Sequence, residues 1–237
     1  MIHLTTKDKD SLPEDFKQNL AIMRRFYPDH EIRIYDDADL DNFVSSAAPA
    51  YHKDVFRRLP SQIMRVDTVR YLWMQILGGL YFDFDIKLQR PWQPQEGAIL
   101  VSREWTWPEA SDIRVSVHNC VFASEPGHGL WSHLLEGIAR QVKQYGSGSA
   151  KWPVVFDVTG PNAISRTISQ GDLTQRLSSL HILEPSVIYQ HGMSKHPREA
   201  AIFVHETAGS WNRPSYFLPG RLKRFGYSAR KFLKSRV

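Results

Sequence analysis

The chain has 237 residues, 42% of them hydrophobic and 23% charged, which is enough for one well-filled globular core. Its single cysteine, Cys120, excludes an intrachain disulfide and a cysteine-based metal cluster. No segment has the roughly 20 consecutive apolar residues of a membrane-spanning helix, and residues 1–10 lack the apolar core of a secretory signal. We therefore expect a cytoplasmic protein.

The net charge of +5 is concentrated at the C-terminal end of the chain. Residues 221–237 hold seven basic and no acidic residues, so residues 1–220 carry a net charge of −2. A nucleic-acid-binding module would be basic over its folded body, and this distribution argues against that class. Apolar residues of the tail fall near one helix face, which predicts a basic amphipathic helix in peripheral contact with an anionic membrane. A solvated tail is the alternative.

The first half of the chain predicts alternating strands and helices. We expect a strand over 2–4, a helix over 13–26 with Ser11 as its cap, a strand over 31–35 and a helix over 36–44. Pro28 ends the first helix.

The segment from Ser61 to Leu88 is the most informative. Apolar residues at 66, 69, 72, 73, 76 and 77 form one helix face, and Gly78 with Gly79 ends the helix because glycine adopts positive φ at little cost. Residues 80–82 are then a short buried strand, and Asp83 and Asp85 follow at its carboxyl end. Open α/β sheets bind ligands at this edge.

The second half continues the same alternation. We predict a strand over 116–124, helices over 128–145 and after Pro161, and a strand over 201–204, with a flexible connector at 146–149. The predicted fold is a single α/β domain over residues 1–220 with a mostly parallel central sheet, followed by the tail 221–237.

The Asp83–Phe84–Asp85 pair suits a hard divalent cation. Mg²⁺ and Mn²⁺ bind through one or two carboxylates together with substrate phosphates, and such an ion stabilises a departing phosphate without proton transfer. An isolated Asp-x-Asp sequence usually lies in a surface loop. Here it directly follows a predicted buried strand, which is unusual for such a loop. A nucleotidyltransferase or hydrolase that uses the same two aspartates is an alternative.

At this point the motifs resemble those of glycosyltransferase family 32. The resemblance rests on Arg65 to Leu72 followed by Gly78 to Asp85. It extends in order over roughly residues 1–212, through Ile34 to Asp37, Asn119, Thr159-Gly160-Pro161, and His205 with Gly209-Ser210-Trp211. The usual tryptophan after the first strand is absent from Ile2 to Thr5.

The resemblance implies a GT-A fold and a role for each matching residue. Asp85 would bind the metal directly, with Asp83 bridging metal and donor and His205 completing the shell of Mn²⁺ or Mg²⁺. Asp67 and Arg70 would contact donor sugar or diphosphate, and an intrahelical ion pair at i and i+3 is the less favoured alternative. The remaining implied residues are Tyr71, Ser210 and Trp211 on the donor side and Asn119 on the acceptor side.

The implied activity is retaining transfer of a hexose from a GDP- or UDP-linked sugar to a glycan or lipid-linked acceptor. Such enzymes serve polysaccharide biosynthesis, and their acceptors would suit a location at the inner face of a membrane. No carboxylate stands out as a nucleophile, so we expect same-face attack, in which the leaving phosphate accepts the acceptor's proton.

Overall fold

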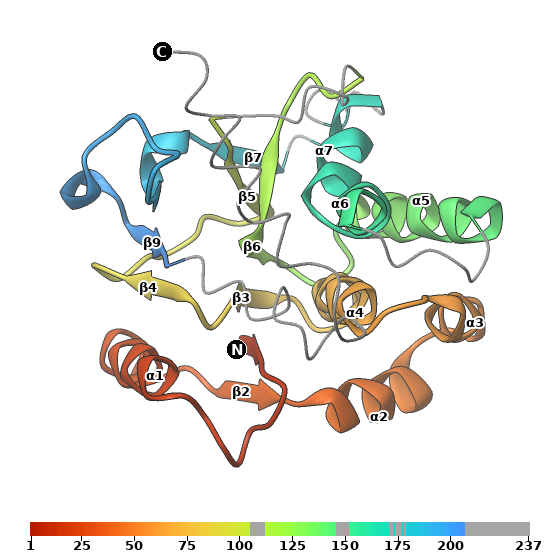
Figure 1. Cartoon of the computed structure of the whole chain (residues 1–237), viewed down its shortest axis with the longest axis horizontal. Coiled ribbons are helices and arrows are strands. Elements are labelled where there is room, and N and C mark those ends of the chain that lie inside the picture. The colour runs from red at the N-terminus through yellow and green to blue at the C-terminus, as the bar shows by residue number, and fades with distance from the viewer. Residues whose placement is uncertain (105–111, 146–151, 171–172, 174–176, 178, 207–237) are drawn as a thin grey trace, which may run out of the picture. The chain divides into compact units, whose positions relative to one another are not determined.

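A six-stranded sheet in the order β2-β1-β3-β6-β5-β7 forms the centre of the computed structural model (Figure 1). The structure describes residues 1–104, 112–145, 152–170, 173, 177 and 179–206. Five strands run in one direction and β6 runs against them, so the predicted mostly parallel sheet is confirmed. The strands are β1 (Ile2–Thr5), β2 (Ile32–Tyr35), β3 (Gly79–Phe82), β5 (Ala98–Ser102), β6 (Val117–Ser124) and β7 (Leu180–Leu183).

A second sheet lies beside the first and begins directly after the two aspartates. It has the order β4-β9-β8, with β4 (Ile86–Leu88) antiparallel to β9 (Phe203–His205) and β9 parallel to β8 (Ile188–Gln190). The pairing of Ile86 with His205 brings the end of the described chain next to Asp85.

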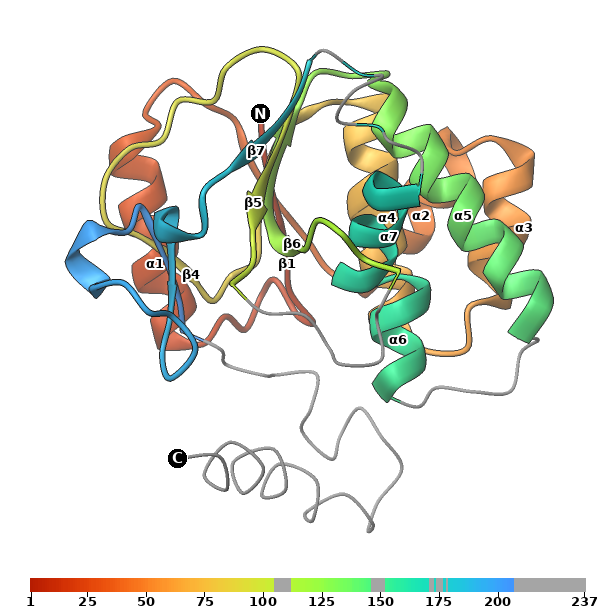
Figure 2. The same ribbon diagram turned by 90° about the horizontal axis from the view of Figure 1, so that it is seen from above.

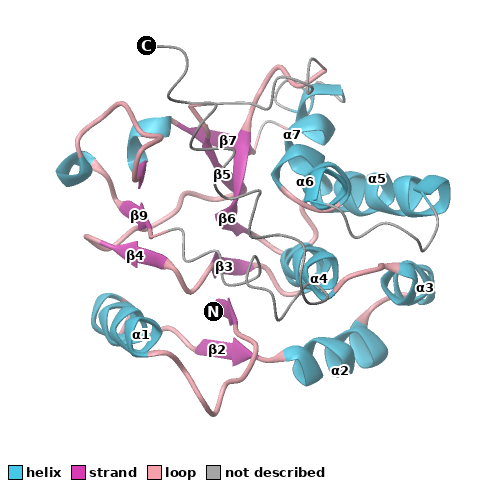
Figure 3. Ribbon diagram, in the orientation of Figure 1, coloured by secondary structure: helices cyan, strands magenta, loops and turns pink. Residues whose placement is uncertain are grey.

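The helices cover the two faces of the central sheet unequally (Figures 2 and 3). On one face lie α1 (Glu14–Phe26) and the second sheet. On the other lie α2 (Asp37–Ala47), α3 (Ala50–Arg58), α4 (Gln62–Ile76), α5 (Gly129–Tyr145), α6 (Trp152–Val158) and α7 (Pro161–Gln170). Two clusters of buried apolar side chains fill the spaces between these layers, one on each side of the sheet. Three layers with a sheet in the middle are the architecture that alternating strands and helices produce.

Local sequence explains most element boundaries. Asp36 caps α2 by accepting from the Asp39 amide, and the Asp39 carboxylate accepts from the Asp36 amide in return. The predicted Ser11 cap is wrong, because α1 begins at Glu14 with Pro13 as its N-cap residue. Proline supplies a favourable φ at this position but no side-chain hydrogen bond.

The turn between α4 and β3 depends on glycine. Gly79 has a φ of +103°, and a Cβ atom there would lie 2.6 Å from the Met1 carbonyl oxygen. The close approach lets β3 lie parallel to β1 from its first residues, with Ile2 opposite Leu80. The turn therefore determines where β3 ends and where Asp83 lies.

Strand β6 is irregular at the same edge of the sheet. Its pairing with β5 shifts register between Leu100, opposite Phe122, and Ser102, opposite Val117. Such bulges bend a strand and redirect its side chains, and they are common beside active sites. The irregular stretch of β6 includes His118, Asn119 and Cys120.

The predicted boundary at residue 220 and the predicted basic helix over 221–237 lie outside the described residues. All of the described elements fall in one compact unit, residues 1–207. Among the described residues, no helix has the length and apolar character that crossing a membrane requires.

Candidate active site

Asp83 follows β3 directly, and neighbours on three elements restrain it. Its amide donates to the Cys120 carbonyl oxygen at 2.8 Å. Its Oδ1 accepts from the Tyr81 hydroxyl at 2.5 Å and lies 3.1 Å from Arg70 Nη1. Thr5 on β1 lies 3.1 Å from the same Tyr81 hydroxyl, so β1 and β3 together orient this carboxylate.

Arg70 on α4 connects the aspartates. Its side chain is 4% exposed, and Nη2 lies 3.1 Å from Asp67 Oδ1 while Nη1 donates to the Asn119 carbonyl oxygen at 2.7 Å. The guanidinium carbon also lies 4.7 Å from the centre of the Tyr81 ring. The planar, multiply donating head group of arginine suits this arrangement, whereas lysine offers a single point charge.

Asp67 is held by three side chains. Its Oδ1 accepts from Asn119 Nδ2 at 3.2 Å and lies beside Arg70, and its Oδ2 accepts from Thr159 Oγ1 at 3.0 Å. The residue is 3% exposed. The i, i+3 pair is thus part of a buried network that joins α4 to β6 and to the residues just before α7.

Burial and charge act in opposite directions on these groups. Burial raises the pKa of Asp67 to about 7, although Arg70 and Thr159 act to lower it. Burial also raises the pKa of Asp83, again against the effect of Arg70. Burial acts to lower the pKa of Arg70, but Asp83, Tyr81 and Asp67 together raise it by more. The net effect is a raised pKa, so the guanidinium stays charged. A charged arginine between two buried acids is a suitable setting for an anionic ligand.

Asp85 and His205 lie on the other side of Asp83. His205 Nε2 is 3.5 Å from Asp85 Oδ2, and both side chains are about five-sixths buried, at 17% and 16% exposure. Burial lowers the pKa of His205, but Asp85 and Asp83 outweigh that effect and raise it. The second sheet produces this contact, because β9 places His205 opposite Ile86.

These residues fit a divalent cation. Within the described part of the chain, the side-chain contacts of Asp83 all use Oδ1, which leaves Oδ2 for a further ligand, and the side chain is 27% exposed. Asp85 and His205 add an oxygen and a nitrogen donor next to it. Two carboxylates and an imidazole with open positions suit Mn²⁺ or Mg²⁺ together with phosphate oxygens.

The structure brings together most of the residues that the sequence predicts for the site. Asp67, Arg70, Asp83, Asp85, Asn119 and His205 all lie at this edge of the sheet. The Asn119 side chain donates to Asp67, and its predicted acceptor-side role stays a prediction. Tyr71 is fully buried and donates to the Thr159 carbonyl oxygen at 2.8 Å. Its predicted donor-side contact stays a prediction. Ser210 and Trp211 lie outside the described residues.

Sequence reasoning missed the contacts of Thr159, Tyr81 and His118. Thr159 is recognisable only as part of a helix-start signal, and its partner Asp67 is 92 residues away. The sequence predicts Tyr81 as a core strand residue. The hydrogen bond from its hydroxyl to Asp83 depends on the geometry of the sheet. His118 and Cys120 have ligand atoms within 4.8 Å of one another and of His205, a proximity that the register shift of β6 creates.

Comparison with known proteins agrees with the fold and with the resemblance to DXD-containing glycosyltransferases. Residues 13–102 match the family model described as the glycosyltransferase sugar-binding region containing the DXD motif. That range includes Asp67, Arg70, Asp83 and Asp85.

The chain is 26% identical over 215 residues to inositol phosphoceramide mannosyltransferase 1 of Schizosaccharomyces pombe, covering 90% of this chain and 61% of that protein. It is also 26% identical over 165 residues to inositol phosphoceramide mannosyltransferase 2 of the same yeast, covering 70% and 44%. The chain thus spans less than two thirds of each of these relatives.

The solved structure of the PaToxG glycosyltransferase shares the fold, with a TM-score of 0.50 and 15% identity over 72% of this chain and 68% of that one. The family match contains the aspartate pair, and the neighbouring structure shares the fold. The chain is therefore similar over residues 13–102 to DXD-containing glycosyltransferases, and its fold is of the GT-A type.

Proposed function

We propose that the protein transfers a hexose from a nucleotide-diphosphate sugar to a hydroxyl-bearing glycan or lipid-linked acceptor, with a divalent cation bound at Asp83 and Asp85. The observation that carries this proposal is the continuous contact series Asp67–Arg70–Asp83 beside Asp85 and His205. This series brings three kinds of group to one edge of the sheet. They are the buried guanidinium of Arg70, the carboxylate pair that would bind the metal, and the Asp67 carboxylate that would face the donor sugar.

Asp83, Asp85 and His205 would hold Mn²⁺ or Mg²⁺. The bound ion supplies positive charge that stabilises the leaving nucleotide diphosphate. Arg70 adds a second, fixed positive charge. Its attraction for the leaving diphosphate is strengthened by burial, because little water screens it. Asp67 would accept a hydrogen bond from a donor-sugar hydroxyl, with Thr159 and Asn119 fixing the carboxylate so that little reorganisation is needed.

Same-face attack with retention is the mechanism that we propose for the transfer. Asp67 and Asp83 are both engaged by Arg70, and neither is free to act as a nucleophile without breaking that contact. The departing phosphate would then accept the proton of the acceptor hydroxyl. Detection of a covalent glycosyl-enzyme by mass spectrometry would overturn this mechanism.

The names of the yeast relatives suggest the first substrates to test. Both are inositol phosphoceramide mannosyltransferases, so a mannosyl donor and an inositol-containing acceptor come first for this chain. UDP-linked glucose, galactose and N-acetylhexosamines are the further donors. A nucleotidyltransferase or hydrolase remains as the alternative, and it assigns no purpose to the network around Asp67.

A thermal-shift panel tests the proposed function. The melting temperature is measured with each nucleotide sugar, with and without Mn²⁺. We expect stabilisation only when metal and one nucleotide type are both present, because the diphosphate and the two carboxylates share the ion. Stabilisation by a nucleoside triphosphate and by no nucleotide sugar would favour the nucleotidyltransferase.

We also propose peripheral membrane contact through residues 221–237, from charge alone. About 1 kcal/mol per basic residue is typical near an anionic surface, and this tail has seven. Removal of residues 221–237 should abolish sedimentation with phosphatidylserine vesicles at low salt. Unchanged sedimentation of the truncated chain would contradict this part of the proposal.

A further inference from the structure

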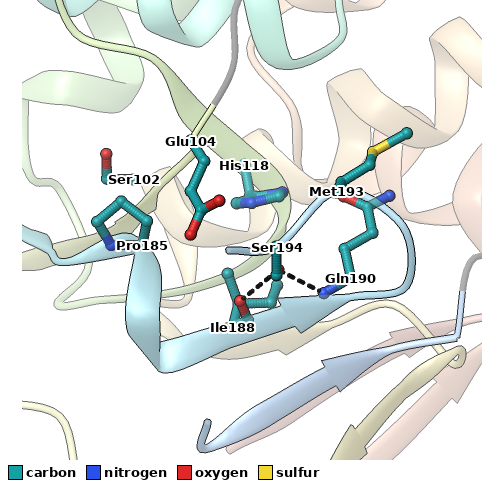
Figure 4. Close-up of a pocket in the computed structure, with 8 residues that line it drawn as sticks. All are labelled: Ser102, Glu104, His118, Pro185, Ile188, Gln190, Met193 and Ser194. Carbon is teal, nitrogen blue, oxygen red and sulfur yellow. Dashed lines mark hydrogen bonds between the residues drawn. The ribbon is translucent and has the colours of Figure 1, made fainter. Parts of the chain in front are cut away.

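A small polar pocket lies between the end of β5, the start of β6 and the loop after β8 (Figure 4). Its polar lining comes from Ser102, Glu104, His118, Gln190 and Ser194. The space open to the centre of a water-sized group is about 10 Å³. A space of that size holds one water molecule or one hydroxyl group and is too small for a sugar ring.

His118 is the main reason to expect a ligand in this pocket. The residue is 8% exposed, and its ring lines the pocket. Within the described residues, the imidazole of His118 makes no hydrogen bond, whereas His3, His128 and His196 each make at least one. The pocket is where this imidazole can find a hydrogen-bond partner, which is either a water molecule or a hydroxyl group of a ligand.

Glu104 provides a second, fixed polar group. Its Oε2 accepts from the Lys195 amide at 2.9 Å, and its Oε1 lies 2.9 Å from His196 Nδ1. The side chain is only 16% exposed, and Figure 4 shows its carboxylate and the His118 ring side by side at the pocket. Ser194 Oγ accepts from the Gln190 amide at 2.8 Å and so fixes the opposite wall. The polar lining is therefore held in place before any ligand binds.

The pocket adjoins the candidate active site at His205. His118 has a ring nitrogen within 4.8 Å of a His205 nitrogen, and His205 in turn lies 3.5 Å from Asp85. Asn119, the next residue of β6, instead bonds Asp67 on the donor side. Strand β6 thus has one residue on each of two neighbouring sites.

We propose that this pocket is an acceptor subsite, in which His118 and Glu104 bind one hydroxyl group of a polyhydroxylated acceptor such as a sugar or an inositol. This inference rests on the proposed function, because it assigns the second substrate of the same site. The imidazole of His118 can donate its N–H to the oxygen of a hydroxyl group while the Glu104 carboxylate accepts the proton of that hydroxyl. A pocket of this size admits one such hydroxyl group of the acceptor. An acceptor with a single hydroxyl would have to use that group either for binding or for reaction, so it would be a poor substrate.

Binding is measured first, because it needs no turnover. Saturation-transfer NMR is recorded with methyl α-D-mannopyranoside and with myo-inositol as probes, and with 1-propanol as the single-hydroxyl comparison. The full chain is used as wild type, as His118→Leu and as Glu104→Gln. We expect a dissociation constant about tenfold higher for at least one polyol in each variant, which is the usual effect of losing a buried hydrogen bond.

His133→Gln is the matched control, because His133 is an exposed histidine on α5 and bonds only its own helix. It should leave polyol binding unchanged. His118→Gln is measured beside His118→Leu, and melting temperatures of all variants check that each is folded. Equal polyol binding in wild type and in both pocket variants would overturn the subsite, and so would an absence of polyol binding to the wild type.

Turnover separates this proposal from the proposed function. With the donor found by the thermal-shift panel, the ratio of polyol glycosylated to donor hydrolysed is measured for each variant. We expect the ratio to fall about tenfold in His118→Leu, while the affinity for nucleotide with Mn²⁺ changes less than about twofold. A wild type that cleaves no nucleotide sugar but binds polyols through His118 would refute the glycosyl transfer and leave the pocket standing. Normal transfer with an unchanged ratio in His118→Leu would refute the pocket alone.

Discussion

Arg70 Nη1 lies 3.1 Å from Asp83 Oδ1, so the first aspartate of the DXD pair has a permanent positive neighbour from helix α4. The contact is buried on the arginine side and partly open on the aspartate side, at 4% and 27% exposure. This asymmetry keeps the guanidinium fixed while one face of the carboxylate stays accessible. It explains how two residues 13 positions apart in the sequence, one on α4 and one directly after β3, form one charged surface.

Replacement of Arg70 by lysine should therefore reduce activity sharply. Lysine keeps the charge but cannot contact Asp67, Asp83 and the Asn119 carbonyl oxygen together. We expect kcat/KM to fall by about 100-fold, equivalent to about 2.7 kcal/mol, since charge-assisted hydrogen bonds contribute about 1.5–3 kcal/mol each. Steady-state kinetics with the identified donor measure this. Arg140→Lys, which alters an exposed ion pair on α5, is the control and should change kcat/KM by less than twofold.

Thr159→Val should weaken both stability and donor use. Valine has the same shape, but it removes the hydrogen bond to Asp67 Oδ2 and leaves that oxygen buried. The free energy of unfolding should fall by about 1–3 kcal/mol. Thr167→Val, which removes a hydroxyl bonded only to its own helix at Ala163, provides the comparison in the same urea titrations. An equal effect of the two substitutions on donor KM would argue against a positioning role for Thr159.

The pKa of Asp67 predicts a pH dependence of stability. Burial raises this pKa to about 7 in the folded state, and an unfolded aspartate has a pKa of about 3.9. The folded state thus favours the protonated carboxyl, so its stabilisation is complete below about pH 4 and is lost as the pH rises towards 7. The full difference is on the order of 4 kcal/mol.

Urea unfolding of the wild type and of Asp67→Asn at several pH values checks this expectation. Relative to Asp67→Asn, the wild type should lose on the order of 3 kcal/mol between pH 4.5 and pH 8. Asp54→Asn, at an exposed ion pair on α3, should follow the wild type. Parallel curves for wild type and Asp67→Asn would show that Asp67 is charged throughout.

His205→Gln should weaken metal binding. If His205 completes the shell at Asp85, the Mn²⁺ concentration for half-maximal turnover should rise by about tenfold or more. Electron paramagnetic resonance of free Mn²⁺ measures the same change without turnover. His133→Gln serves again as the exposed control, and equal Mn²⁺ affinity in all three proteins would exclude His205 as a ligand.

Local sequence predicts the elements that position the aspartates, because the signals there are strong. Helix α4, the two glycines after it and the apolar run of β3 each follow from local apolar content and backbone freedom, although α4 is buried on nearly every side and not on one face alone. The strand β6 and helix α5 are equally well marked by their length and apolar pattern. These elements place Asp83 correctly at the edge of the sheet.

Short or non-local features could not be predicted in the same way. Strands β4 and β8 have three residues each and exist through their pairing with β9, so no local period identifies them. Helix α3 and strand β5 were also missed, although Ala98–Ser102 is apolar throughout. The contacts of Thr159 with Asp67 and of Glu104 with His196 each join residues about 90 positions apart, and only the folded chain shows them.

The most direct test of the metal-dependent mechanism is donor turnover of the wild type and of Asp85→Asn, titrated with Mn²⁺ after treatment with a chelator. Asparagine keeps the size of the side chain and removes the charge that would bind the ion. We predict that the chelated wild type is inactive and recovers with Mn²⁺. Asp85→Asn should remain folded but stay at least about 1,000-fold less active at saturating Mn²⁺. That ratio corresponds to about 4 kcal/mol of lost transition-state stabilisation. Full activity of the chelated wild type, or of Asp85→Asn, would contradict it.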